Sequence, residues 1–310
     1  MDRNALRKLI VGPIGAIPTP FDKDREVDLG AMHDMVLRII DGGVSDGNGV
    51  IKIASALGEG PMLRDDEWPA LLSTAVQAAN GQAPVMLGIH HKDTKRTIED
   101  SNRAADLGAV GLQIAPPIYN IPTQQDMYDY FYDVANAIDI GIMIYHTKWM
   151  PGGGIETDTF VRMKDISNIV AVKWSGSLSG NYEDMQKFND VFNIIDNTAD
   201  PVRCIRLGGN GYVQTVMDAN PRHEMKVWEL LKNGKFEEAE TVYHTVYDDV
   251  MRMADEVGQR SGGQSTVIKG LSEIVGHSLG DPRPPSKGMN DAEKAKLRKL
   301  VIGWGWNLPS

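Results

Sequence analysis

The sequence alternates short apolar runs with longer amphipathic stretches about eight times. The apolar runs are rich in Val, Ile or Met and almost continuously hydrophobic, which is typical of strands buried on both faces of a parallel sheet. Helical patterns lie between them, for example at 29–40, 65–79, 94–107 and 124–137, with Asp28, Asp93 and Thr123 as candidate N-caps. The strands are expected at roughly 12–18, 49–55, 84–90, 109–115, 140–145, 168–174, 191–196 and 211–216.

Strict alternation of strand and helix predicts an α/β fold with a parallel sheet. Eight units in about 230 residues favour a closed (β/α)8 TIM barrel over an open, doubly wound sheet. A Rossmann-like fold is the alternative, but no G-x-G-x-x-G follows the first strand. From about residue 222 the pattern is helical, at 222–232, 235–257, 264–277 and 291–301. We therefore predict a barrel carrying the active site over 1–221, and the last barrel helix with a C-terminal helical extension over 222–310.

Charge and cysteine content narrow the function classes. The net charge is −10 without a basic cluster, so nucleic acid is not an expected partner. No apolar run reaches transmembrane length, and the stretch 9–20, broken by Pro13 and Pro18, is expected to be a strand rather than a signal peptide. Cys204 is the single cysteine and offers no intramolecular disulfide. We expect a cytoplasmic enzyme that acts on small molecules away from membranes.

In a barrel of this kind, chemistry takes place at the carboxyl ends of the strands. Lys173 ends the run 168–173, where burial would lower the ammonium pKa and free the amine to attack a carbonyl. The run alone does not distinguish this from a lysine that reaches from a strand end to water. Polar and aromatic residues gather at other predicted strand ends, at 55–59, 88–91, 116–120, 145–148 and 196–197.

Read together, these strand ends resemble the dihydrodipicolinate synthase / N-acetylneuraminate lyase superfamily. Its members are class I aldolases and lyases that form a Schiff base with a 2-oxo acid, usually pyruvate. The resemblance runs from about residue 12 to 221 and extends in weaker form into the helical tail. No single motif is specific to the family, but the ordered set of motifs with its spacing is. The matching segments are GAIPTPF at 15–21, LGE at 57–59, PIYN at 117–120, IY at 144–145, VAVK at 170–173, GGNG at 208–211 and NP at 220–221.

The resemblance implies three catalytic roles. Lys173 would be the nucleophile that forms the imine, and Tyr145 the proton shuttle near the substrate carboxylate. Tyr119 would be a second tyrosine that reaches across a dimer interface, within a homotetramer built as a dimer of dimers. For each tyrosine, the alternative is a strand-end aromatic whose hydroxyl faces water. Because the protonated imine is itself the electron sink, no external cofactor and no metal are expected.

The loop after the second strand departs from the family pattern. The synthase places two hydroxyl residues there, which relay protons and hold the pyruvate carboxylate. Here the positions are Ala56 and Leu57, whose side chains cannot donate a hydrogen bond, although their backbone N–H groups can bind a carboxylate. Ser55 is a less favoured substitute, because a one-residue offset in a strand usually points to the other face.

The segment after the fifth strand departs as well. The synthase carries an arginine a few residues beyond its tyrosine for the carboxylate of the second substrate. Here the sequence is YHTKWMPG at 145–152, without arginine. Lys148 could supply charge but not a bidentate fork. Trp149 suggests an apolar or aromatic acceptor, with a residue packed on the rim as the alternative.

Three of the seven histidines, His90, His91 and His146, follow predicted strands. One such histidine is more often structural, but three at one barrel mouth suggest that one of them takes over the proton transfer or carboxylate binding lost from the loop. Gln214 or Thr215 is expected to line the pocket. Among other candidates, Lys52 is a distant second choice for the imine, because it lies in mid-strand. Glu59 is expected to hold the loop.

We thus predict a Schiff-base lyase, an aldolase or a dehydratase, that acts on pyruvate or a related 2-oxo acid, with an aldehyde as an optional second substrate. The altered loop and missing arginine argue against 4-hydroxy-tetrahydrodipicolinate synthase itself, which stays open as an alternative. A catalytically weakened homologue that only binds 2-oxo acids is the other. Trp149 and Leu57 slightly favour a second substrate with an apolar or aromatic part, as in the hydratase-aldolases of aromatic degradation.

Overall fold

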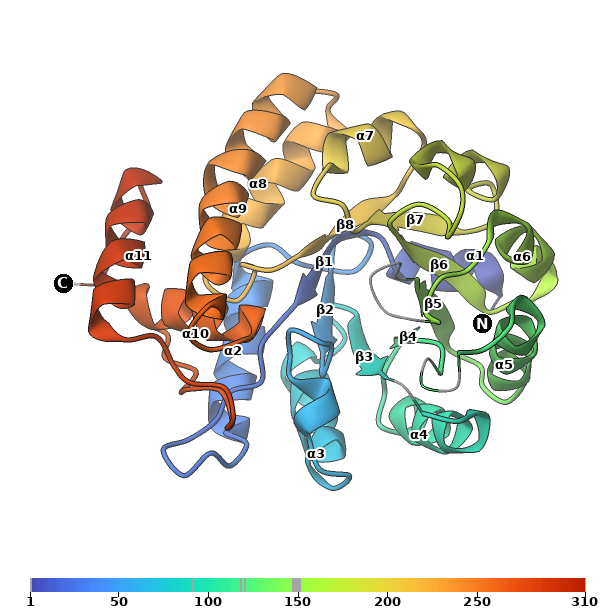
Figure 1. The fold of residues 1–310 in the computed structure, drawn as a ribbon, viewed down its shortest axis with the longest axis horizontal. Helices are drawn as coiled ribbons and strands as arrows, with labels where there is room; N and C mark the ends of the chain where they lie inside the picture. The colour runs from blue at the N-terminus through green and yellow to red at the C-terminus, as the bar shows by residue number, and fades with distance from the viewer. Residues whose placement is uncertain (1, 91, 118, 120, 147–151, 310) are drawn as a thin grey trace.

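Eight parallel strands form a closed barrel, which confirms the predicted fold (Figure 1). The computed structural model describes residues 2–90, 92–117, 119, 121–146 and 152–309, with backbone only at residue 264. Each strand pairs with the next in sequence, and β8 closes onto β1. The strands are β1 (Gly12–Ala16), β2 (Val50–Ile53), β3 (Val85–Ile89), β4 (Gly111–Ile114), β5 (Gly141–Tyr145), β6 (Ile169–Trp174), β7 (Asn193–Asp196) and β8 (Gly211–Gln214).

Helices follow the strands and form the outer ring. Asp28, Asp93 and Thr123 are N-caps as expected, since each side chain accepts a hydrogen bond from a backbone N–H in the first turn. The helices of the ring are α2 (Leu29–Asp41), α3 (Glu67–Ala79), α4 (Thr94–Asp106), α5 (Gln124–Asn136), α6 (Thr157–Arg162), α7 (Pro201–Arg206) and α8 (Pro221–Lys232). Short 3-10 turns lie at η1 (Gly60–Met62), η2 (Met163–Asp165) and η3 (Tyr182–Lys187).

A short helix, α1 (Arg3–Leu9), precedes the barrel and was not expected from the sequence. Its Leu6 and the following Ile10 are buried in a cluster with barrel-interior residues such as Ile14 and Met86. Ile10 lies directly against Gly111 and Gly141, where a larger residue would collide with it. The helix therefore caps the amino-terminal end of the barrel, opposite the predicted chemistry.

The C-terminal extension packs beside the barrel mouth. It contains α9 (Phe236–Gly258), α10 (Gln264–Ile274) and α11 (Asp291–Gly303), which occupy the left side of Figure 1. Val246 and Val250 of α9 share a buried apolar cluster with Ala16 and Leu57 of the barrel. This contact brings a helix from the tail into reach of the strand ends.

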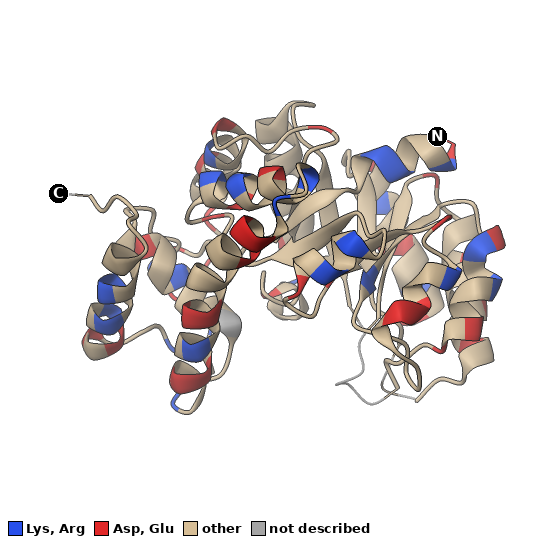
Figure 2. Ribbon diagram, turned by 90° about the horizontal axis from the view of Figure 1, so that it is seen from above, with Lys and Arg blue, Asp and Glu red and all other residues tan. Residues whose placement is uncertain are grey.

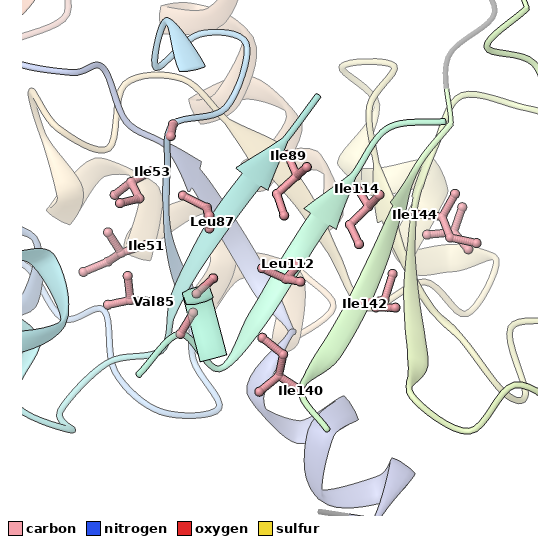
Figure 3. Close-up of a cluster of buried hydrophobic side chains, with 14 of the residues drawn as sticks. Ile51, Ile53, Val85, Leu87, Ile89, Leu112, Ile114, Ile140, Ile142 and Ile144 are labelled. Carbon is pink, nitrogen blue, oxygen red and sulfur yellow. The ribbon is translucent and has the colours of Figure 1, made fainter. Parts of the chain in front are cut away.

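The strands alternate between side chains that face the helices and side chains that face the barrel interior, apart from a register shift where β6 pairs with Ile142 and Met143 of β5. Ile51, Ile53, Leu112 and Ile114 belong to the apolar cluster between the sheet and the helices, as Figure 3 shows. Because successive side chains in a strand point to opposite faces, the residues between them point into the barrel. Charged residues of both signs are spread mostly over the outer helices (Figure 2).

Inward side chains form stacked layers of four, each layer drawn from alternate strands. The register fixes their membership: Lys52 pairs with Met86 and Met86 with Gly111, so Gln113, two residues further along, is level with Lys52. Moving on by two strands and two residues at a time, once around the whole barrel, leads back to the residue from which the layer began. The lower layer is Ile14, Met86, Met143 and Ile195; the middle layer is Lys52, Gln113, Lys173 and Val213; the upper layer is Ala16, Gly88, Tyr145 and Asn197.

Candidate active site

A cavity of about 630 Å³ opens at the carboxyl end of the barrel. Its floor consists of Lys173 and Val213 from the middle layer with Ala16, Tyr145 and Asn197 from the upper one. Small residues in the upper layer leave room above the lysine. The walls come from the loop after β2, the ends of β6 to β8 and the C-terminal extension: Ser55, Ala56, Leu57, Glu59, Pro61, Met62, Ser175, Asp196, Ala199, Thr215, Tyr243, Tyr247, Met251, Gly263, Ser265 and Ser286.

Lys173 lies at the base of this cavity and is almost completely buried. Its Nζ lies 4.2 Å from the ring centre of Tyr145, its neighbour on β5. Burial lowers the pKa of Lys173 to about 8. Near neutral pH a usable fraction of the amine is therefore unprotonated, and that fraction rises as the pH rises through about 8.

Tyr145 is held between Lys173 and the histidine at the end of β3. The rings of Tyr145 and His90 meet edge to face, with centroids 6.1 Å apart. Burial raises the pKa of Tyr145 to about 12. At neutral pH the residue is thus a phenol that can donate a proton or a hydrogen bond into the cavity.

The loop after β2 turns sharply at Ala54. This residue has a left-handed φ of 49°, which breaks the strand alternation and rotates the next residue toward the cavity. Gly60 packs so closely on Ala54 that an added Cβ would lie 1.8 Å from its carbonyl oxygen. Ser55 consequently lines the cavity beside Ala56 and Leu57, contrary to the expectation that its offset would point it away.

Two hydroxyl groups at the cavity are available to form a hydrogen bond with a ligand. Within the part of the chain that the structure describes, neither Ser55 Oγ nor Thr215 Oγ1 has a hydrogen-bond partner, although both atoms are buried. Ser175 contributes a third hydroxyl, which accepts a hydrogen bond of 3.1 Å from Asn197 Nδ2. Of these hydroxyls, the sequence predicted Thr215 as a candidate to line the pocket, whereas Ser55 was less favoured because an unbroken strand was assumed there.

Gln214 does not line the cavity, which corrects one prediction. Its Oε1 accepts a 2.6 Å hydrogen bond from the backbone N–H of Val216, and the side chain also lies beside Glu224 of α8. Gln214 thus faces the outer ring, while the next residue, Thr215, faces the cavity. Because successive side chains of a strand point to opposite faces, only one of the two residues that the sequence offered, Gln214 or Thr215, can face the cavity.

His146 belongs to the core rather than the cavity. It is fully buried between Phe160 and Trp174. Its Nδ1 accepts a 3.1 Å hydrogen bond from the N–H of Ile155, so the proton resides on Nε2, which lies 2.5 Å from the carbonyl oxygen of Gly176. The expectation of a catalytic role for His146 is therefore not supported by its position.

His90 borders a second cavity of about 360 Å³ that shares Pro61 with the first. Its ring contacts Tyr145, which lines the active-site cavity. His91, Lys148 and Trp149, the other predicted site residues, lie outside the described residues. The structure thus brings together Lys173, Tyr145, Ala56 and Leu57 from the predicted set.

Tyr119 is exposed on the surface of the single chain. It is 95% exposed, and its neighbour Ile121 is 70% exposed. Neither residue is among those that line the cavity. A role at the active site would require a second copy to bring Tyr119 to it, as the resemblance implies.

One wall of the cavity comes from α9 and was missed in the sequence analysis. Tyr243 and Tyr247 stack with ring centroids 5.0 Å apart, and Met251 continues the same helical face. Their spacing of four residues is the signal that could have identified this stripe. Glu59, in the loop after β2, pairs with the buried Lys269 of α10 at 3.2 Å, which ties the loop to the C-terminal extension.

Two negative findings concern the described residues alone. None of their His, Cys, Asp and Glu side chains gather in groups of three or more that could hold a metal ion. No helix among them is long and apolar enough to cross a membrane.

Comparison with known proteins places the chain in a family. Residues 10–302 match the model of the dihydrodipicolinate synthetase family. The 4-hydroxy-tetrahydrodipicolinate synthase of Heliobacterium modesticaldum is 30% identical over 296 residues, which cover 94% of this chain and 95% of that protein. A synthase 1 of Halalkalibacterium halodurans is 25% identical over 302 residues, covering 95% and 97%.

Solved structures agree with the fold. Dihydrodipicolinate synthase from Aquifex aeolicus superposes with a TM-score of 0.84 at 24% identity, covering 97% of this chain and 100% of that one. YagE, a prophage protein of the same family from Escherichia coli K12, solved in complex with pyruvate, gives 0.84 at 20% identity, covering 96% and 99%. The chain belongs to the dihydrodipicolinate synthetase family, whose members are lyases of the class I aldolase type.

Proposed function

We propose that this protein is a lyase that binds pyruvate or a related 2-oxo acid as an imine on Lys173. The observation that carries the proposal is the place of this lysine: a buried amine with a pKa of about 8 at the floor of a cavity that opens at the carboxyl ends of the strands. An amine so placed is a nucleophile near neutral pH, whereas an exposed lysine is not.

The imine forms in two steps. The unprotonated amine of Lys173 adds to the 2-oxo carbon, and the carbonyl oxygen takes up a proton while the nitrogen releases one, which gives a neutral carbinolamine. A second proton then lets that oxygen leave as water, so that a protonated imine remains. Tyr145, a phenol 4.2 Å from the amine as measured to its ring centre, is the proposed proton donor.

The imine makes the adjacent carbon reactive. Loss of a proton or cleavage of a carbon–carbon bond there leaves an enamine, because the protonated nitrogen accepts the electron pair. The enamine can take up a proton, add to an aldehyde, or expel a hydroxyl from the neighbouring carbon. Each route passes through the same enamine, so the lysine defines the chemistry and the rest of the cavity the substrate.

The loop after β2 is the proposed carboxylate site. Ala56 and Leu57 line the cavity, and their backbone N–H groups are the proposed donors to the carboxylate next to the 2-oxo carbon. Ser55 and Thr215 supply hydroxyls that the altered loop positions lack. We infer that the proton relay has moved to these two residues.

The outer part of the cavity favours an acceptor with an apolar or aromatic group. Tyr247, Met251, Met62 and Leu57 line it with aromatic and aliphatic surface, and Ser265 offers a hydroxyl. This composition supports a cleavage, condensation or dehydration that involves an aromatic aldehyde or its 2-oxo acid adduct. The same preference for an aromatic acceptor was inferred from Trp149 in the sequence, and here it is supported by residues that the structure describes.

Two alternatives remain. The names of the relatives favour 4-hydroxy-tetrahydrodipicolinate synthase, but at 25–30% identity and without hydroxyls at Ala56 and Leu57 the activity itself does not carry over. A homologue that binds a 2-oxo acid without turnover would keep the imine and lose the relay. As in its family, no external cofactor is proposed, since the imine is covalent.

A turnover screen tests the proposal. Purified protein is incubated with pyruvate and a panel of aromatic, aliphatic and aspartate-semialdehyde acceptors, with product formation followed by mass spectrometry. We expect condensation with an aromatic aldehyde that disappears in Lys173→Met. Preference for aspartate semialdehyde would establish the synthase instead, and no product with any acceptor would favour the binding homologue.

A further inference from the structure

Ser175 and Asn197 lie side by side where β6 and β7 end at the mouth of the cavity, and we call their side chains the mouth pair. Trp174 pairs with Asp196, so the next residues of the two strands, Ser175 and Asn197, are neighbours. The backbone N–H of Asn197 donates a 2.9 Å hydrogen bond to the carbonyl of Trp174, which continues the ladder to this point. Both residues line the cavity, and Asn197 Nδ2 donates a 3.1 Å hydrogen bond to Ser175 Oγ.

The carboxylate of Asp196 holds the backbone on both sides of Asn197. Its Oδ1 accepts hydrogen bonds from the hydroxyls of Tyr182 at 2.8 Å and Thr198 at 2.6 Å. Its Oδ2 accepts from the backbone N–H groups of Thr198 at 3.1 Å and Asp200 at 3.0 Å. This almost fully buried carboxylate is thus engaged in fixing the turn after β7, and the direction of the Asn197 side chain is fixed with it.

Side chains behind the cavity wall tie the two strand ends together. The indole N–H of Trp174 on β6 donates a 2.8 Å hydrogen bond to the carbonyl of Tyr182, whose hydroxyl binds Asp196 on β7. Arg203 covers the ring of Tyr182, with its guanidinium carbon 3.9 Å from the ring centre. Because these neighbours lock the supporting residues, the mouth pair is held in one arrangement before a substrate binds.

The hydrogen bond from Asn197 decides what the serine hydroxyl can do. A hydroxyl carries one hydrogen and two lone pairs. Because Asn197 donates to the oxygen, the hydrogen of Ser175 is left to donate elsewhere, and within the described residues Ser175 Oγ has no other hydrogen-bond partner. Lys173 faces the same interior, about 7 Å deeper along the chain direction of β6. The serine can therefore donate to a substrate that extends from the lysine toward the mouth.

We propose that Asn197 is a positioning residue, which holds the hydroxyl of Ser175 as a hydrogen-bond donor to the aldehyde oxygen of the second substrate. The inference rests on the proposed imine at Lys173. It assigns a purpose to the buried contact between Asp196 and Tyr182, which the imine steps do not use. The carbon–carbon step thereby depends on residues other than those of imine formation.

The bond changes explain why a donor is needed at this oxygen. In condensation the enamine carbon forms a bond to the aldehyde carbon, the π electrons of the carbonyl group move onto its oxygen, and the enamine nitrogen becomes that of a protonated imine. The alkoxide then takes up one proton from water, and cleavage runs through the same steps in reverse. A donor fixed beforehand stabilises the negative charge as it forms. The oxygen lost during imine formation is a different one, for which Tyr145 is the proposed proton donor.

A double-mutant cycle tests this role. Condensation of pyruvate with the best aldehyde is measured for Ser175→Ala, Asn197→Leu and the double variant, and deuterium exchange into the pyruvate methyl group is followed by NMR without an aldehyde. Ser175→Ala should lower kcat for condensation by about 10²-fold. Asn197→Leu should lower it by about tenfold. The double variant should be no slower than Ser175→Ala, because Asn197 acts through Ser175, and methyl exchange should be unchanged in every variant.

Matched variants separate positioning from packing. Ser175→Thr keeps the hydroxyl on a residue that suits a strand end, and should restore most of the condensation rate that Ser175→Ala loses. Ser179→Ala removes an exposed hydroxyl outside the cavity and should leave both rates in place. Asn197→Ala replaces Asn197→Leu in the cycle if the leucine variant does not fold.

The outcomes are distinct from those of the proposed function. Absence of both methyl exchange and a pyruvate adduct in wild type would remove the imine and with it this inference. Exchange in wild type without condensation of any aldehyde would overturn the role of the mouth pair alone. An unchanged condensation rate in both single variants would do the same, as would losses that multiply in the double variant, since Asn197 would then act independently of Ser175. Loss of methyl exchange in step with condensation would show that the two residues are merely structural and would overturn the inference as well.

Discussion

At the scale of single residues, the cavity combines Lys173, the proposed nucleophile, with partners that differ from those the family pattern implies. Lys173 and Tyr145 are adjacent on neighbouring strands, so their contact follows from the barrel itself. Ser55 reaches the cavity only because Ala54 adopts a left-handed conformation. The backbone of one residue thus decides which hydroxyl faces the substrate.

The rearranged relay leads to the first prediction. Ser55→Ala and Thr215→Val should each lower kcat/KM by about 10²-fold, because each removes a hydroxyl proposed to move a proton or hold the carboxylate. Steady-state kinetics with the best acceptor measures this. Ser179→Ala, an exposed hydroxyl outside the cavity, is the control. Unchanged kinetics in both cavity variants would show that the relay lies elsewhere.

His146 gives a second prediction at this scale. His146→Leu should destabilise the fold by about 2–5 kcal/mol, since it leaves the N–H of Ile155 and the carbonyl of Gly176 buried without partners. Urea unfolding measures the loss. Under conditions where the variant is folded, the pH dependence of turnover should match that of wild type; a displaced profile would restore a catalytic role.

At the scale of elements, sequence reasoning succeeded where one pattern has one structural solution. Continuous apolar runs and capping residues such as Asp28 and Asp93 were sufficient for the strands and the long helices. It failed at α1, which is too short to show a helical period, and at His146 and Gln214, where strand alternation decides between core and cavity. Packing of α9 over the mouth depends on contacts between segments far apart in sequence.

Helix α9 carries the third prediction. Tyr247→Ala should raise KM for an aromatic acceptor by about tenfold, because it removes aromatic surface from the cavity wall, and should leave imine formation with pyruvate unchanged. Steady-state kinetics and trapping measure the two effects. Thr241→Ala, exposed on the same helix and not among the residues that line the cavity, serves as the control. Equal loss for aliphatic and aromatic acceptors would argue against an aromatic subsite.

At the scale of the whole molecule, Tyr119 and Ile121 are the most exposed large apolar side chains among the described residues. Tyr119 and Ile121 follow β4 and precede α5, away from the cavity. Side chains of this size are seldom left so open in the assembled state, and a second copy is the occupant that we propose. The family resemblance implies that Tyr119 reaches the active site of the neighbouring copy in such an assembly, and this stays a prediction.

The fourth prediction concerns this assembly. Ile121→Asp should lower the molar mass in solution by at least half, because it buries a charge in the proposed contact. Sedimentation velocity measures this, with Ile302→Asp on the exposed face of α11 as the matched control. A wild-type protein that is monomeric at micromolar concentration would remove both the interface and the role of Tyr119.

The central claim is that the chemistry starts with an imine on Lys173. Pyruvate and sodium borohydride are added together to wild type and to Lys173→Met, and the protein is digested and mapped by mass spectrometry. We predict one reduced pyruvate adduct per chain, on the peptide that contains Lys173, with a yield that rises as the pH rises through about 8, and none in the variant. An adduct on Lys52, or no adduct with pyruvate or any other 2-oxo acid, would contradict this account.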